Sequence, residues 1–352
     1  MKNAKKILVA MSGGVDSSVA AAVLIEEGFD VTGVTMKLWG GPSDTGCCSV
    51  SDVIDARRVA DQLEIPHHVF NFGDEFDAHV VEPYVEAHAI GQTPNPCIEC
   101  NRHVKFDKLF RRANALGFDM IATGHHAQIS EEKGKFRIMR SVDQSKDQSY
   151  VLHMLTQGQL QKLRFPIGTM TKKEVREKAS ALALQTAGKA DSQDVCFISR
   201  TKGGRQIFLQ ERLQMTSGKV IDATGAKIAE VDAVQMVTIG QRKGLGVSGK
   251  RNPRYAIDVD VQQATVTVGP KDDLFCEETP IADLQWVGEP DERNLDIQTS
   301  AHGKTSLARV DDRIIWEEPH MKVAPGQSIV FYRNNQVIGS AIAVKASDNF
   351  SK

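Results

Sequence analysis

Ser12-Gly13-Gly14-Val15-Asp16-Ser17-Ser18 connects a short apolar run at 7–11 to an apolar, helix-periodic segment at 19–25. The apolar run is typical of a buried strand, so we expect the stretch to form a strand-to-helix turn. Such a turn directs backbone N–H groups and a helix N-terminus toward an anion. The paired glycines allow a positive φ and a close approach to a ligand. The serine hydroxyls add donors, and Asp16 could hold Mg²⁺ against phosphate oxygens.

This turn differs from the Walker phosphate loop, which needs Gly-x-x-x-x-Gly-Lys-Ser/Thr. The chain contains Gly-Lys-Thr at 303–305, but Gln298 stands where the first glycine of that motif should be. The turn instead resembles the pyrophosphate loop, Ser-Gly-Gly-x-Asp-Ser, of ATP pyrophosphatases. Those enzymes cleave ATP to AMP and pyrophosphate, adenylating an oxygen so that a nucleophile can displace AMP. We therefore expect ATP and Mg²⁺, with a ligand-free glycine turn as the alternative.

Length and composition limit the class of protein. A chain of 352 residues is predicted to form two or three domains. No apolar run of 18 residues occurs, and the first strand begins too early for a signal peptide, so we expect a cytoplasmic protein without a membrane span. The net charge of −2 does not indicate a nucleic-acid binder, although local basic patches could bind RNA. Six cysteines in so long a chain favour catalytic or metal-binding thiols over structural disulfides.

The first part of the chain, 1–204, alternates strand-like and helix-like segments, which predicts a Rossmann-like α/β domain with a parallel sheet. Ligands of such sheets bind beyond the carboxyl ends of the strands. The pyrophosphate loop, Met36, Gly124 and His125 all follow such ends. The expected strands are 7–11, 31–36, 68–72 and 120–124, and the expected helices are 19–25, 52–63, 74–90, 107–116 and 171–184. Thr171 and Glu174 are predicted to form a capping box that opens the last of these helices.

Beyond residue 200 the segments become shorter and alternate in polarity between turns. After a short helix at 208–213, we predict a small mostly-β domain at 205–274 and a C-terminal β-barrel at 275–352. Asn334-Asn335 is predicted to turn a hairpin of the barrel. The expected strands are 219–221, 255–259, 264–268, 284–287, 306–310, 328–332 and 337–339.

A second informative stretch is Gln92-Thr93-Pro94-Asn95-Pro96-Cys97-Ile98-Glu99-Cys100-Asn101. Its two prolines predict a rigid loop that stays out of a helix. A loop that ends in cysteines just before the helix at 107–116 would hold a reactive thiolate at a helix entrance. Cys196 follows about a hundred residues later, in the segment 191–198.

Several segments in one order resemble the tRNA-specific 2-thiouridylases of the MnmA/TrmU family, over nearly the whole chain. Besides the loop motif they are Thr123-Gly124-His125-His126, Lys146-Asp147-Gln148-Ser149-Tyr150, the 191–198 segment and Gly240-Gln241-Arg242-Lys243-Gly244-Leu245-Gly246. That family replaces O2 of the wobble uridine, position 34, of certain tRNAs by sulfur. The resemblance implies adenylation of uridine O2 with release of pyrophosphate. A cysteine persulfide would then attack C2 and release AMP, forming 2-thiouridine.

The same resemblance assigns roles to individual residues. Cys196 would carry the persulfide, and Cys100 would release its sulfur, leaving a disulfide to be reduced before the next turnover. A cysteine desulfurase or a sulfur-relay protein would supply the sulfur. The implied ATP contacts are Ala10, Met11, Ser12, Gly13, Gly14, Val15, Asp16, Ser17, Met36 and Gly124. The unstacked target base would meet Asn95, Pro96 and Cys97, and other parts of the tRNA would meet His125, Lys146, Asp147, Gln148 and Gln327.

One departure from the family keeps a different sulfur chemistry open. Many members carry Asp where this chain has Cys97. Cys97, Cys100 and Cys196 could therefore hold a [4Fe-4S] cluster whose open iron binds hydrosulfide. A zinc site that includes Cys47 and Cys48 is a further alternative, although we expect these two to be loop thiols without a catalytic role. We expect Cys276 to serve packing.

Other charged and titratable residues receive plainer interpretations. We expect His126 to be structural and Lys172-Lys173 to form a solvated helix face. Arg242-Lys243 and Lys250-Arg251 are better candidates for RNA contacts. Two rival functions remain: an amidotransferase or ligase of the same superfamily would need no paired thiols, and an RNA-binding or iron–sulfur carrier with a vestigial ATP site would release no pyrophosphate.

Overall fold

The computed structural model describes residues 4–38, 49–191, 195–198, 203–247, 253–290 and 293–346. Its internal contacts divide the chain into two compact units. The first unit comprises Met1–Val81, Pro96–Thr201 and Asn334–Val337, and the second comprises Glu82–Asn95, Lys202–Arg333 and Ile338–Lys352. The domain limits given above stay predictions. The assignment of residues 82–95 to the second unit was not predicted from the sequence, because this segment begins in the middle of a continuous helical run.

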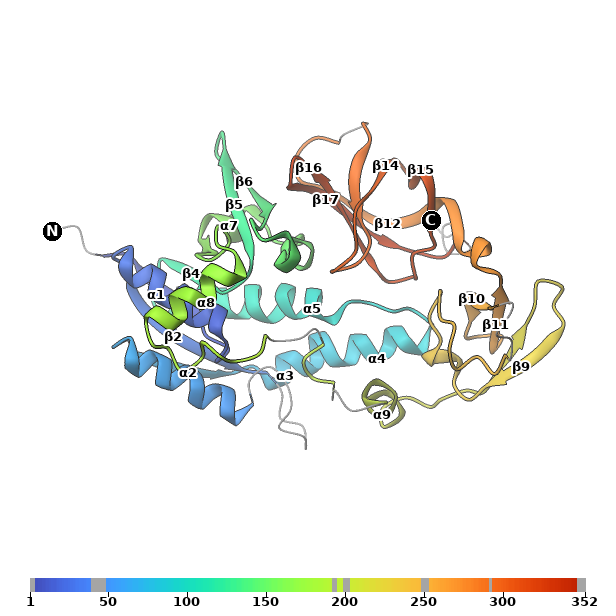
Figure 1. The fold of residues 1–352 in the computed structure, drawn as a ribbon, viewed down its shortest axis with the longest axis horizontal. Coiled ribbons are helices and arrows are strands. Elements are labelled where there is room, and N and C mark those ends of the chain that lie inside the picture. Colours follow the sequence, from blue (N-terminus) through green and yellow to red (C-terminus); the bar gives the residue numbers. More distant parts are fainter. Residues whose placement is uncertain are drawn as a thin grey trace. The chain divides into compact units, whose positions relative to one another are not determined.

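The first unit contains a five-stranded sheet of order β3-β2-β1-β4-β7, parallel at every pairing (Figure 1). This confirms the predicted Rossmann-like architecture. The strand order reverses beside β1, and such a switch point opens a crevice at the carboxyl ends of the strands. The strands are β1 (Lys6–Ala10), β2 (Asp30–Lys37), β3 (His67–Asn71), β4 (Met120–Thr123) and β7 (Leu163–Arg164).

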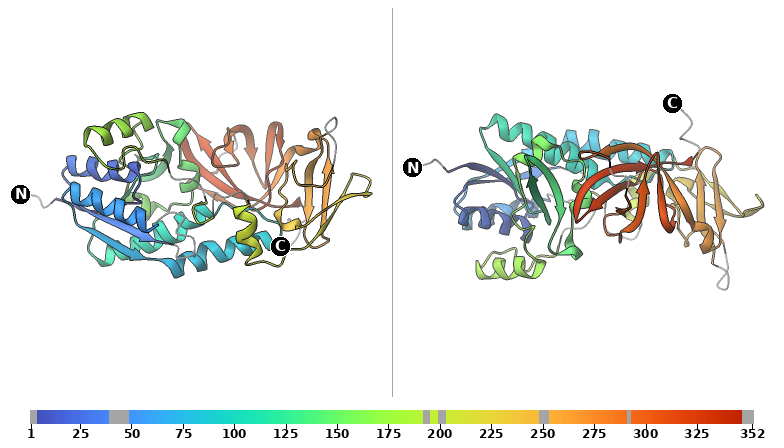
Figure 2. Two further views of the ribbon diagram at one scale, coloured as in Figure 1. Left: turned by 60° about the horizontal axis from the view of Figure 1, so that its bottom comes forward. Right: turned by 90° about the horizontal axis from the view of Figure 1, so that it is seen from above.

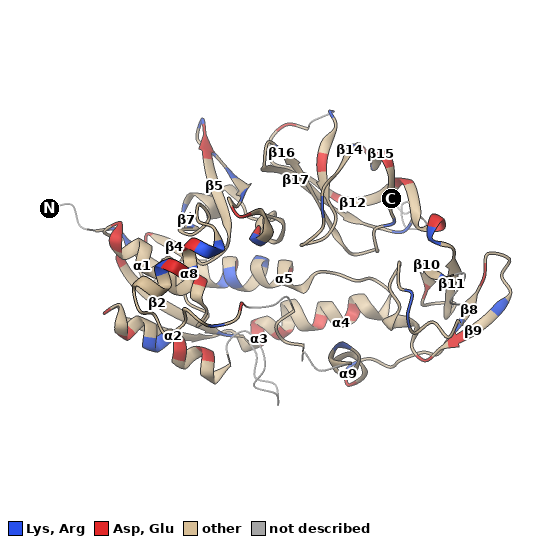
Figure 3. Cartoon of the chain, viewed as in Figure 1, with Lys and Arg blue, Asp and Glu red and all other residues tan. Residues whose placement is uncertain are grey.

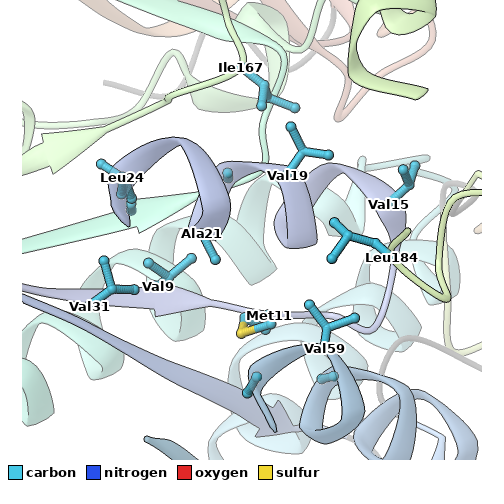
Figure 4. Close-up of a cluster of buried hydrophobic side chains, with 14 of the residues drawn as sticks. Val9, Met11, Val15, Val19, Ala21, Leu24, Val31, Val59, Ile167 and Leu184 are labelled. Atoms are coloured by element: carbon cyan, nitrogen blue, oxygen red, sulfur yellow. The ribbon is translucent and has the colours of Figure 1, made fainter. Parts of the chain in front are cut away.

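Helices lie on both faces of this sheet (Figure 2). The helix α1 (Val15–Glu26) packs on β1 and β2 and against α8 (Lys172–Ala181). Because it is covered on several sides, α1 is apolar nearly all round rather than amphipathic. Figure 4 shows α1 between β1 and Ile167, within an apolar cluster that also includes Leu184. Capping boxes start α2 (Val50–Gln62) and α8, the latter as predicted from Thr171 and Glu174.

Two helical runs contain π-helical turns that the sequence did not reveal. The predicted helix 74–90 consists of α3 (Gly73–Phe76), η1 (Asp77–Val81) and α4 (Glu82–Ala89). The second run is α5 (Pro96–Glu99), η2 (Cys100–Lys108) and α6 (Leu109–Ala115). The prediction of a non-helical loop through Cys100 was therefore wrong. Pro96 begins the helix, where its missing N–H is not needed and its fixed φ suits the first turn.

The rest of the first unit is a hairpin and short helices that were not predicted from the sequence. They are β5 (Ala127–Glu132), β6 (Lys135–Arg140), η3 (Gln144–Lys146), η4 (Ser149–Leu152) and α7 (Gln157–Gln161). In the hairpin, Ala127 pairs with Arg140 and Glu132 with Lys135 in an antiparallel register. The hairpin begins directly after the Gly124-His125-His126 turn.

The second unit contains two β-structures. Both follow the helix α9 (Gly204–Gln210) in the chain. A four-stranded sheet of order β10-β11-β8-β9 encloses its own apolar cluster. An antiparallel barrel runs β12-β15-β14-β13-β16-β17 and closes through the β12–β17 pairing, which confirms the predicted barrel. The strands are β8 (Gly218–Ile221), β9 (Lys227–Val231), β10 (Tyr255–Asp260), β11 (Thr265–Gly269), β12 (Phe275–Trp286), β13 (Leu295–Gln298), β14 (Ser306–Val310), β15 (Arg313–Met321), β16 (Ser328–Arg333) and β17 (Gln336–Ala343), with 3-10 turns η5 (Val234–Met236) and η6 (Lys271–Leu274).

The sequence predicted the positions of β8, β10, β11, β14 and β16 and missed β9, β13 and β15. The predicted strand 284–287 covers only the end of β12, and the predicted strand 337–339 covers only part of β17. Asn334 and Asn335 have φ of 48° and 64°, as the predicted hairpin turn requires. No helix in the described parts of the chain is long and apolar enough to span a membrane.

Candidate active site

The turn between β1 and α1 is held against two neighbouring segments by glycines. Gly13 has φ +70°, and a Cβ there would lie 2.3 Å from the carbonyl oxygen of Asp52 in α2. A Cβ on Gly124, just beyond β4, would lie 2.5 Å from the backbone nitrogen of Ser17. The ends of β1 and β4 and the first turns of α1 and α2 thus meet with no room for a side chain at either position. This brings the pyrophosphate loop and Gly124 together, as expected for one site.

The serines of the loop have different tasks. Ser17 Oγ accepts a hydrogen bond from the Ser12 backbone N–H and donates one to the Gly14 carbonyl, both at 3.2 Å. Ser18 is fully buried, and its hydroxyl bonds the Gly14 carbonyl at 2.8 Å and Thr186 Oγ1 at 3.1 Å. The Ser18 hydroxyl therefore serves the fold rather than a ligand. Ser12, which is half-buried, keeps the more accessible hydroxyl.

The apolar residues predicted to contact ATP are buried. Ala10, Met11, Val15 and Met36 each expose 9 % or less of their surface. Any contact that they make with a ligand must therefore come mainly from their backbone groups. The backbone N–H groups of the first turn of α1, from Val15 onward, have no partner within the helix and suit an anion.

Asp16 joins a buried network of charged side chains. Both of its carboxylate oxygens accept hydrogen bonds from Lys172 Nζ at 2.7 Å, and His126 Nε2 lies 3.1 Å from Oδ1. Burial alone would raise the pKa of Asp16, but the bonds from His126 and Lys172 outweigh it and the pKa lies below its usual value. Lys172 exposes only 9 % of its surface, so the predicted solvated helix face was wrong at this position. His126, expected to be structural, directly contacts the loop aspartate.

The same lysine reaches a second carboxylate. Lys172 Nζ lies 2.9 Å from Asp191 Oδ1, which also accepts from Arg176 at 2.7 Å. Lys146 Nζ donates to Asp191 Oδ2 at 2.8 Å. Burial would raise the pKa of Asp191, but the bonds from Lys146 and Lys172 hold it well below its usual range. The bond to Asp191 raises the pKa of Lys146, so this predicted tRNA contact stays positively charged.

Lys189 fixes the neighbouring helix. Its Nζ lies 2.7 Å from Asp52 and 2.6 Å from Asp55 in α2. Burial would lower the pKa of Lys189, but the bonds to these two carboxylates raise it overall. Since Asp52 also packs against Gly13, this ion pair supports the wall of the turn. No sequence signal marked Lys189, and Asp191 was noted only as the start of the 191–198 segment, because each gains its partners only through tertiary contacts.

The segment after β4 is rigid and largely uncharged. His125 Nδ1 lies 2.7 Å from Thr123 Oγ1, and its ring packs against Phe106 and Phe165 at centroid distances of 5.8 and 5.9 Å. Burial holds the pKa of His125 well below its usual value, so the ring is neutral at pH 7. A neutral imidazole can stack or hydrogen-bond but does not attract phosphate as a charge.

Asp147 and Gln148 support this turn from the inside. The Asp147 carboxylate accepts hydrogen bonds from Arg140, from the backbone N–H of Ser141 and from Ser149, and its side chain is only 4 % exposed. Gln148 Oε1 accepts from the His126 backbone N–H at 2.9 Å. Contact of these two side chains with tRNA stays a prediction. In the structure, Asp147 holds Arg140 and the Ser141 backbone, and Gln148 holds the His126 backbone.

The cysteine segments meet in the first unit. The Val195 backbone N–H donates to Cys97 Sγ at 3.4 Å, so the residues next to Cys196 lie against the start of α5. Phe197 is buried and packs edge-on against Phe76 in α3, with ring centroids 5.5 Å apart. Val195 has φ +53°, an uncommon conformation for a β-branched residue and one that here directly precedes Cys196. Cys100, in the following helical turn, is 6 % exposed.

The same cysteines are the candidate ligands of a metal ion or a cluster. Within the described ranges, no three His, Cys, Asp or Glu side chains are grouped so that they could hold a metal ion. As placed, Cys97, Cys100 and Cys196 thus do not gather around a single metal ion. Cys47 and Cys48 lie outside the described residues, as do Lys250 and Arg251. Cys276 is half-buried on β12, where burial raises the pKa of its thiol.

In the second unit, the predicted tRNA contact Gln327 holds the chain that leads to Asn95. Its amide donates to the carbonyl of Thr93, while the Thr93 N–H donates to the Pro325 carbonyl at 2.9 Å. Gly326 packs tightly here, since a Cβ would lie 3.0 Å from Gln92 Cβ. Arg242 and Lys243 are exposed, as an RNA contact would require.

Comparisons with known proteins cover the whole chain. Residues 5–200 match the family described as tRNA methyl transferase HUP domain, 206–270 its PRC-barrel domain, and 278–343 the aminomethyltransferase beta-barrel domain. The tRNA-specific 2-thiouridylase MnmA of Clostridium botulinum (strain Eklund 17B / Type B) is 40 % identical over 352 residues, covering 96 % of this chain and 97 % of the relative. The enzyme of the same name from Chloroflexus aurantiacus (strain ATCC 29366 / DSM 635 / J-10-fl) is 42 % identical over 347 residues, covering 95 % and 96 %.

Among solved structures, the U34-tRNA thiolase NcsA of Methanococcus maripaludis with its [4Fe-4S] cluster is 20 % identical. It covers 60 % of this chain and 65 % of that one at a TM-score of 0.37, a similarity too low to support an inference. The curated relatives, which match the chain from end to end, are sufficient to establish its family. At about 40 % identity from end to end, they establish that this chain is a tRNA sulfurtransferase and belongs to the family of tRNA-specific 2-thiouridylases.

Proposed function

We propose that the enzyme converts uridine 34 of tRNA into 2-thiouridine by using ATP to activate O2 and a cysteine persulfide to deliver sulfur. The observation that carries the proposal is the hydrogen bond from the Val195 N–H to Cys97. It joins the segment of Cys196 to the helix that bears Cys100, in the unit that also contains the pyrophosphate loop. An ATP-activating turn and two thiol segments in one unit fit adenylation followed by sulfur transfer.

ATP would bind across the carboxyl ends of β1 and β4. The N–H groups at the start of α1 and the Ser12 hydroxyl would receive its phosphates, and Gly124 would leave room for close backbone approach. The carboxylate of Asp16 is the type of hard oxygen ligand that Mg²⁺ prefers, and it lies in the first turn of α1. Bound there, Mg²⁺ would neutralise charge on the triphosphate.

The reaction would proceed in two stages. Uridine O2 attacks the α-phosphorus, so that an O2–P bond forms, the bond to the β-phosphate breaks and pyrophosphate leaves. The outer sulfur of the Cys196 persulfide then adds to C2, and AMP departs with the electrons of the C2–O2 bond. The Cys100 thiolate attacks Sγ of Cys196 and breaks the S–S bond, which leaves the outer sulfur on C2. The resulting Cys100–Cys196 disulfide needs two electrons and two protons from a cellular reductant before the next turnover.

A cysteine desulfurase or a sulfur-relay protein would load Cys196, in the cytoplasm. Asn95, Pro96 and Cys97 would receive the extruded base, and Lys146 would attract tRNA phosphate, adding affinity rather than sequence reading. A [4Fe-4S] cluster on Cys97, Cys100 and Cys196 is the alternative to the persulfide as the source of sulfur. Three cysteine thiolates are the ligand type that such a cluster takes, although as placed these three do not gather around a single metal ion.

The test is tRNA thiolation by anaerobically purified protein, with iron and acid-labile sulfide measured in the same preparation. The assay contains ATP, cysteine and a cysteine desulfurase. Activity without iron that is lost in Cys100→Ser and Cys196→Ser, but retained in Cys276→Ser as the matched control, supports the proposal. Activity that requires iron, and is also lost when Cys97 is replaced, would indicate that a cluster rather than a persulfide delivers the sulfur.

The rival functions have their own outcomes in this assay. Pyrophosphate release that persists in both Cys100→Ser and Cys196→Ser, with no thiolated tRNA from any variant, would favour a ligase or amidotransferase. Binding of tRNA without any release of pyrophosphate would favour a carrier protein.

A further inference from the structure

Asn101 is a buried amide in the turn that carries Cys100. It is the second residue of η2 and exposes only 1 % of its surface. Its Nδ2 donates a hydrogen bond to the Val151 carbonyl at 2.8 Å. Because a carbonyl oxygen can only accept, this partner determines which end of the amide faces it. Its Oδ1 has no hydrogen-bond partner among the residues that the structure describes.

Fold stability is a weak reason for an amide at this position. Asparagine is a poor helix former, because its side chain competes for backbone hydrogen bonds. A buried polar atom without a partner also destabilises a fold. A leucine, which is similar in size, would avoid both costs. What the single hydrogen bond of Asn101 connects gives a better reason for the amide.

The other end of this hydrogen bond lies in η4, the 3-10 turn that follows the segment Lys146-Asp147-Gln148. A turn of four residues leaves its last carbonyls without partners inside the turn, and Asn101 supplies a donor for the carbonyl of Val151. Ser149, Tyr150 and Leu152 are fully buried. The turn η4 is therefore enclosed by packing, and Asn101 joins it to η2.

Asp147 fixes the start of the same turn. Its carboxylate accepts hydrogen bonds from the Ser149 N–H at 3.2 Å and from the Ser149 hydroxyl at 2.7 Å. Arg140 donates to the carboxylate at 2.8 Å. A continuous path of hydrogen bonds and buried backbone therefore leads from Asp147 through η4 to Asn101 and the adjacent Cys100. All of these residues lie in the first unit.

The Asn101–Val151 bond joins two neutral groups. Asn101 and the four residues of η4 are uncharged, whereas basic residues follow in the rest of η2 (Figure 3). A buried hydrogen bond of this kind is directional and is little screened by salt. It is suited to holding one geometry rather than to attracting a ligand.

We propose that Asn101 is a positioning residue for sulfur release, which couples the Lys146-Asp147-Gln148 segment to the thiol of Cys100. When tRNA contacts that segment, the Asn101–Val151 bond transmits the contact to the turn of Cys100. It thereby sets the direction from which the Cys100 thiolate attacks Sγ of Cys196, as the bond to the outer sulfur breaks. The inference rests on the proposed function in taking Cys100 as the attacking thiol and this segment as a tRNA contact.

The experiment compares Asn101→Leu with Asn114→Leu in the full chain. Asn114, in α6, is the matched control, because its side chain also bonds another element, at Lys162, but is exposed. Enzyme loaded with persulfide on Cys196 is mixed with tRNA and ATP, and pyrophosphate and 2-thiouridine are measured over one turnover.

We expect Asn101→Leu to slow the formation of 2-thiouridine by at least about tenfold, because a displacement of about 1 Å at a reacting group can cost about a hundredfold. First-turnover release of pyrophosphate and the affinity for tRNA should change by less than about threefold, since ATP and tRNA do not bind through this amide. The melting temperature should stay within about 4 °C of the wild type, because the lost hydrogen bond is offset by the removal of an unpartnered oxygen.

Alkylation of Cys100 by iodoacetamide, measured by mass spectrometry with and without tRNA, provides a readout that a purely structural role would not move. In the wild type, tRNA should change the rate of alkylation. In Asn101→Leu the rate should be the same with and without tRNA, and Asn114→Leu should behave like the wild type. Ser149→Ala removes the hydroxyl bond to Asp147 at the far end of the path and should weaken the tRNA effect as well.

A wild-type rate of 2-thiouridine formation in Asn101→Leu would overturn the proposal. So would a tRNA effect on Cys100 alkylation that is equal in the wild type and Asn101→Leu, because that pattern means that bound tRNA shields the thiol directly. If Asn101→Leu does not fold, Ser149→Ala decides. Slower sulfur transfer with a weaker tRNA effect supports the coupling, and wild-type behaviour in both assays refutes it.

The proposed function is scored on the wild type alone. A wild type that never forms 2-thiouridine would remove the proposed function and this inference with it. A thiolating wild type whose sulfur transfer is indifferent to Asn101 would remove only the inference.

Discussion

Replacing Gly124 by alanine tests the close packing between the end of β4 and the pyrophosphate loop. The new Cβ would lie 2.5 Å from Ser17 N, 2.7 Å from Asp16 C and 2.8 Å from Ser17 Cα. All three atoms belong to the backbone of the first turn of α1, so no side chain can rotate away. Gly124 does not need a positive φ, and the whole effect of the substitution is therefore steric.

The size of the effect follows from these distances. Ordinary contact of a Cβ begins at 3.4 Å, so the loop or the β4 end must move by about 0.9 Å. Overpacking of this kind costs about 1–3 kcal/mol in the free energy of unfolding. A displacement of about 1 Å at a site that positions reacting groups can lower the rate by about a hundredfold. We expect Gly124→Ala to lose far more ATP-dependent activity than stability.

Denaturant unfolding measures the free energy, and pyrophosphate release with saturating tRNA and varied ATP measures the site. Gly158→Ala in α7 is the matched control, since it has nothing within 4 Å of its Cβ and needs no positive φ. It should stabilise the helix by about 0.5–1 kcal/mol and leave the activity unchanged. A Gly124→Ala enzyme with wild-type stability, ATP KM and kcat would refute the packing argument.

Three further predictions address the network, a buried histidine and the Cys196 segment. Because bonds from Lys146 and Lys172 depress the pKa of Asp191 against its burial, its contribution to stability is complete above the unfolded value of 3.8 and is lost as the pH falls below it. The difference in unfolding free energy between wild type and Asp191→Asn should therefore shrink below pH 3.8, and a constant difference would contradict this. Burial lowers the pKa of His153 to about 3, and neither ring nitrogen has a hydrogen-bond partner. His153→Leu should raise the unfolding free energy by about 1 kcal/mol and remove the loss of stability as the pH falls from 6.5 toward 3; destabilisation at pH 7 would show that the ring has a partner. Phe197→Ala removes the contact with Phe76 and should cost about 3 kcal/mol of local packing, so that alkylation of Cys196 becomes faster, and an unchanged rate would contradict the anchoring role of this ring.

Much of the fold was accessible from local sequence patterns. The apolar runs predicted four strands of the parallel sheet, and the Thr171–Glu174 capping box predicted the start of α8. Asn334-Asn335 predicted the β16–β17 turn, because few residues tolerate its backbone angles. Each of these signals acts between residues that are close in the sequence, so no tertiary information is needed to interpret it.

Predictions from local sequence patterns failed at Pro96, at the strands β9 and β15 and at the π-helical turns. The prolines around Asn95 suggested a loop, yet Pro96 occupies the one helical turn in which proline is favourable. The missed strands β9 and β15 do not alternate strictly: Ile228 is an exposed apolar residue in β9, and Glu317 and Glu318 are consecutive exposed charges in β15. The π-helical turns around Cys100 were also invisible, because they depend on how the helix packs along its length.

The sequence by itself determined the kind of chemistry: a pyrophosphate loop for ATP and separated cysteines for sulfur. Tertiary structure alone decided which charges complete the site. Lys172 looked like a solvent-facing lysine because hydrophobic periodicity describes a single helix, and its partners Asp16 and Asp191 belong to other segments. The same holds for His126 and for the contact between Val195 and Cys97. Electrostatic partners are selected by distance in space, and distance in space is set by packing of the whole unit rather than by order along the chain.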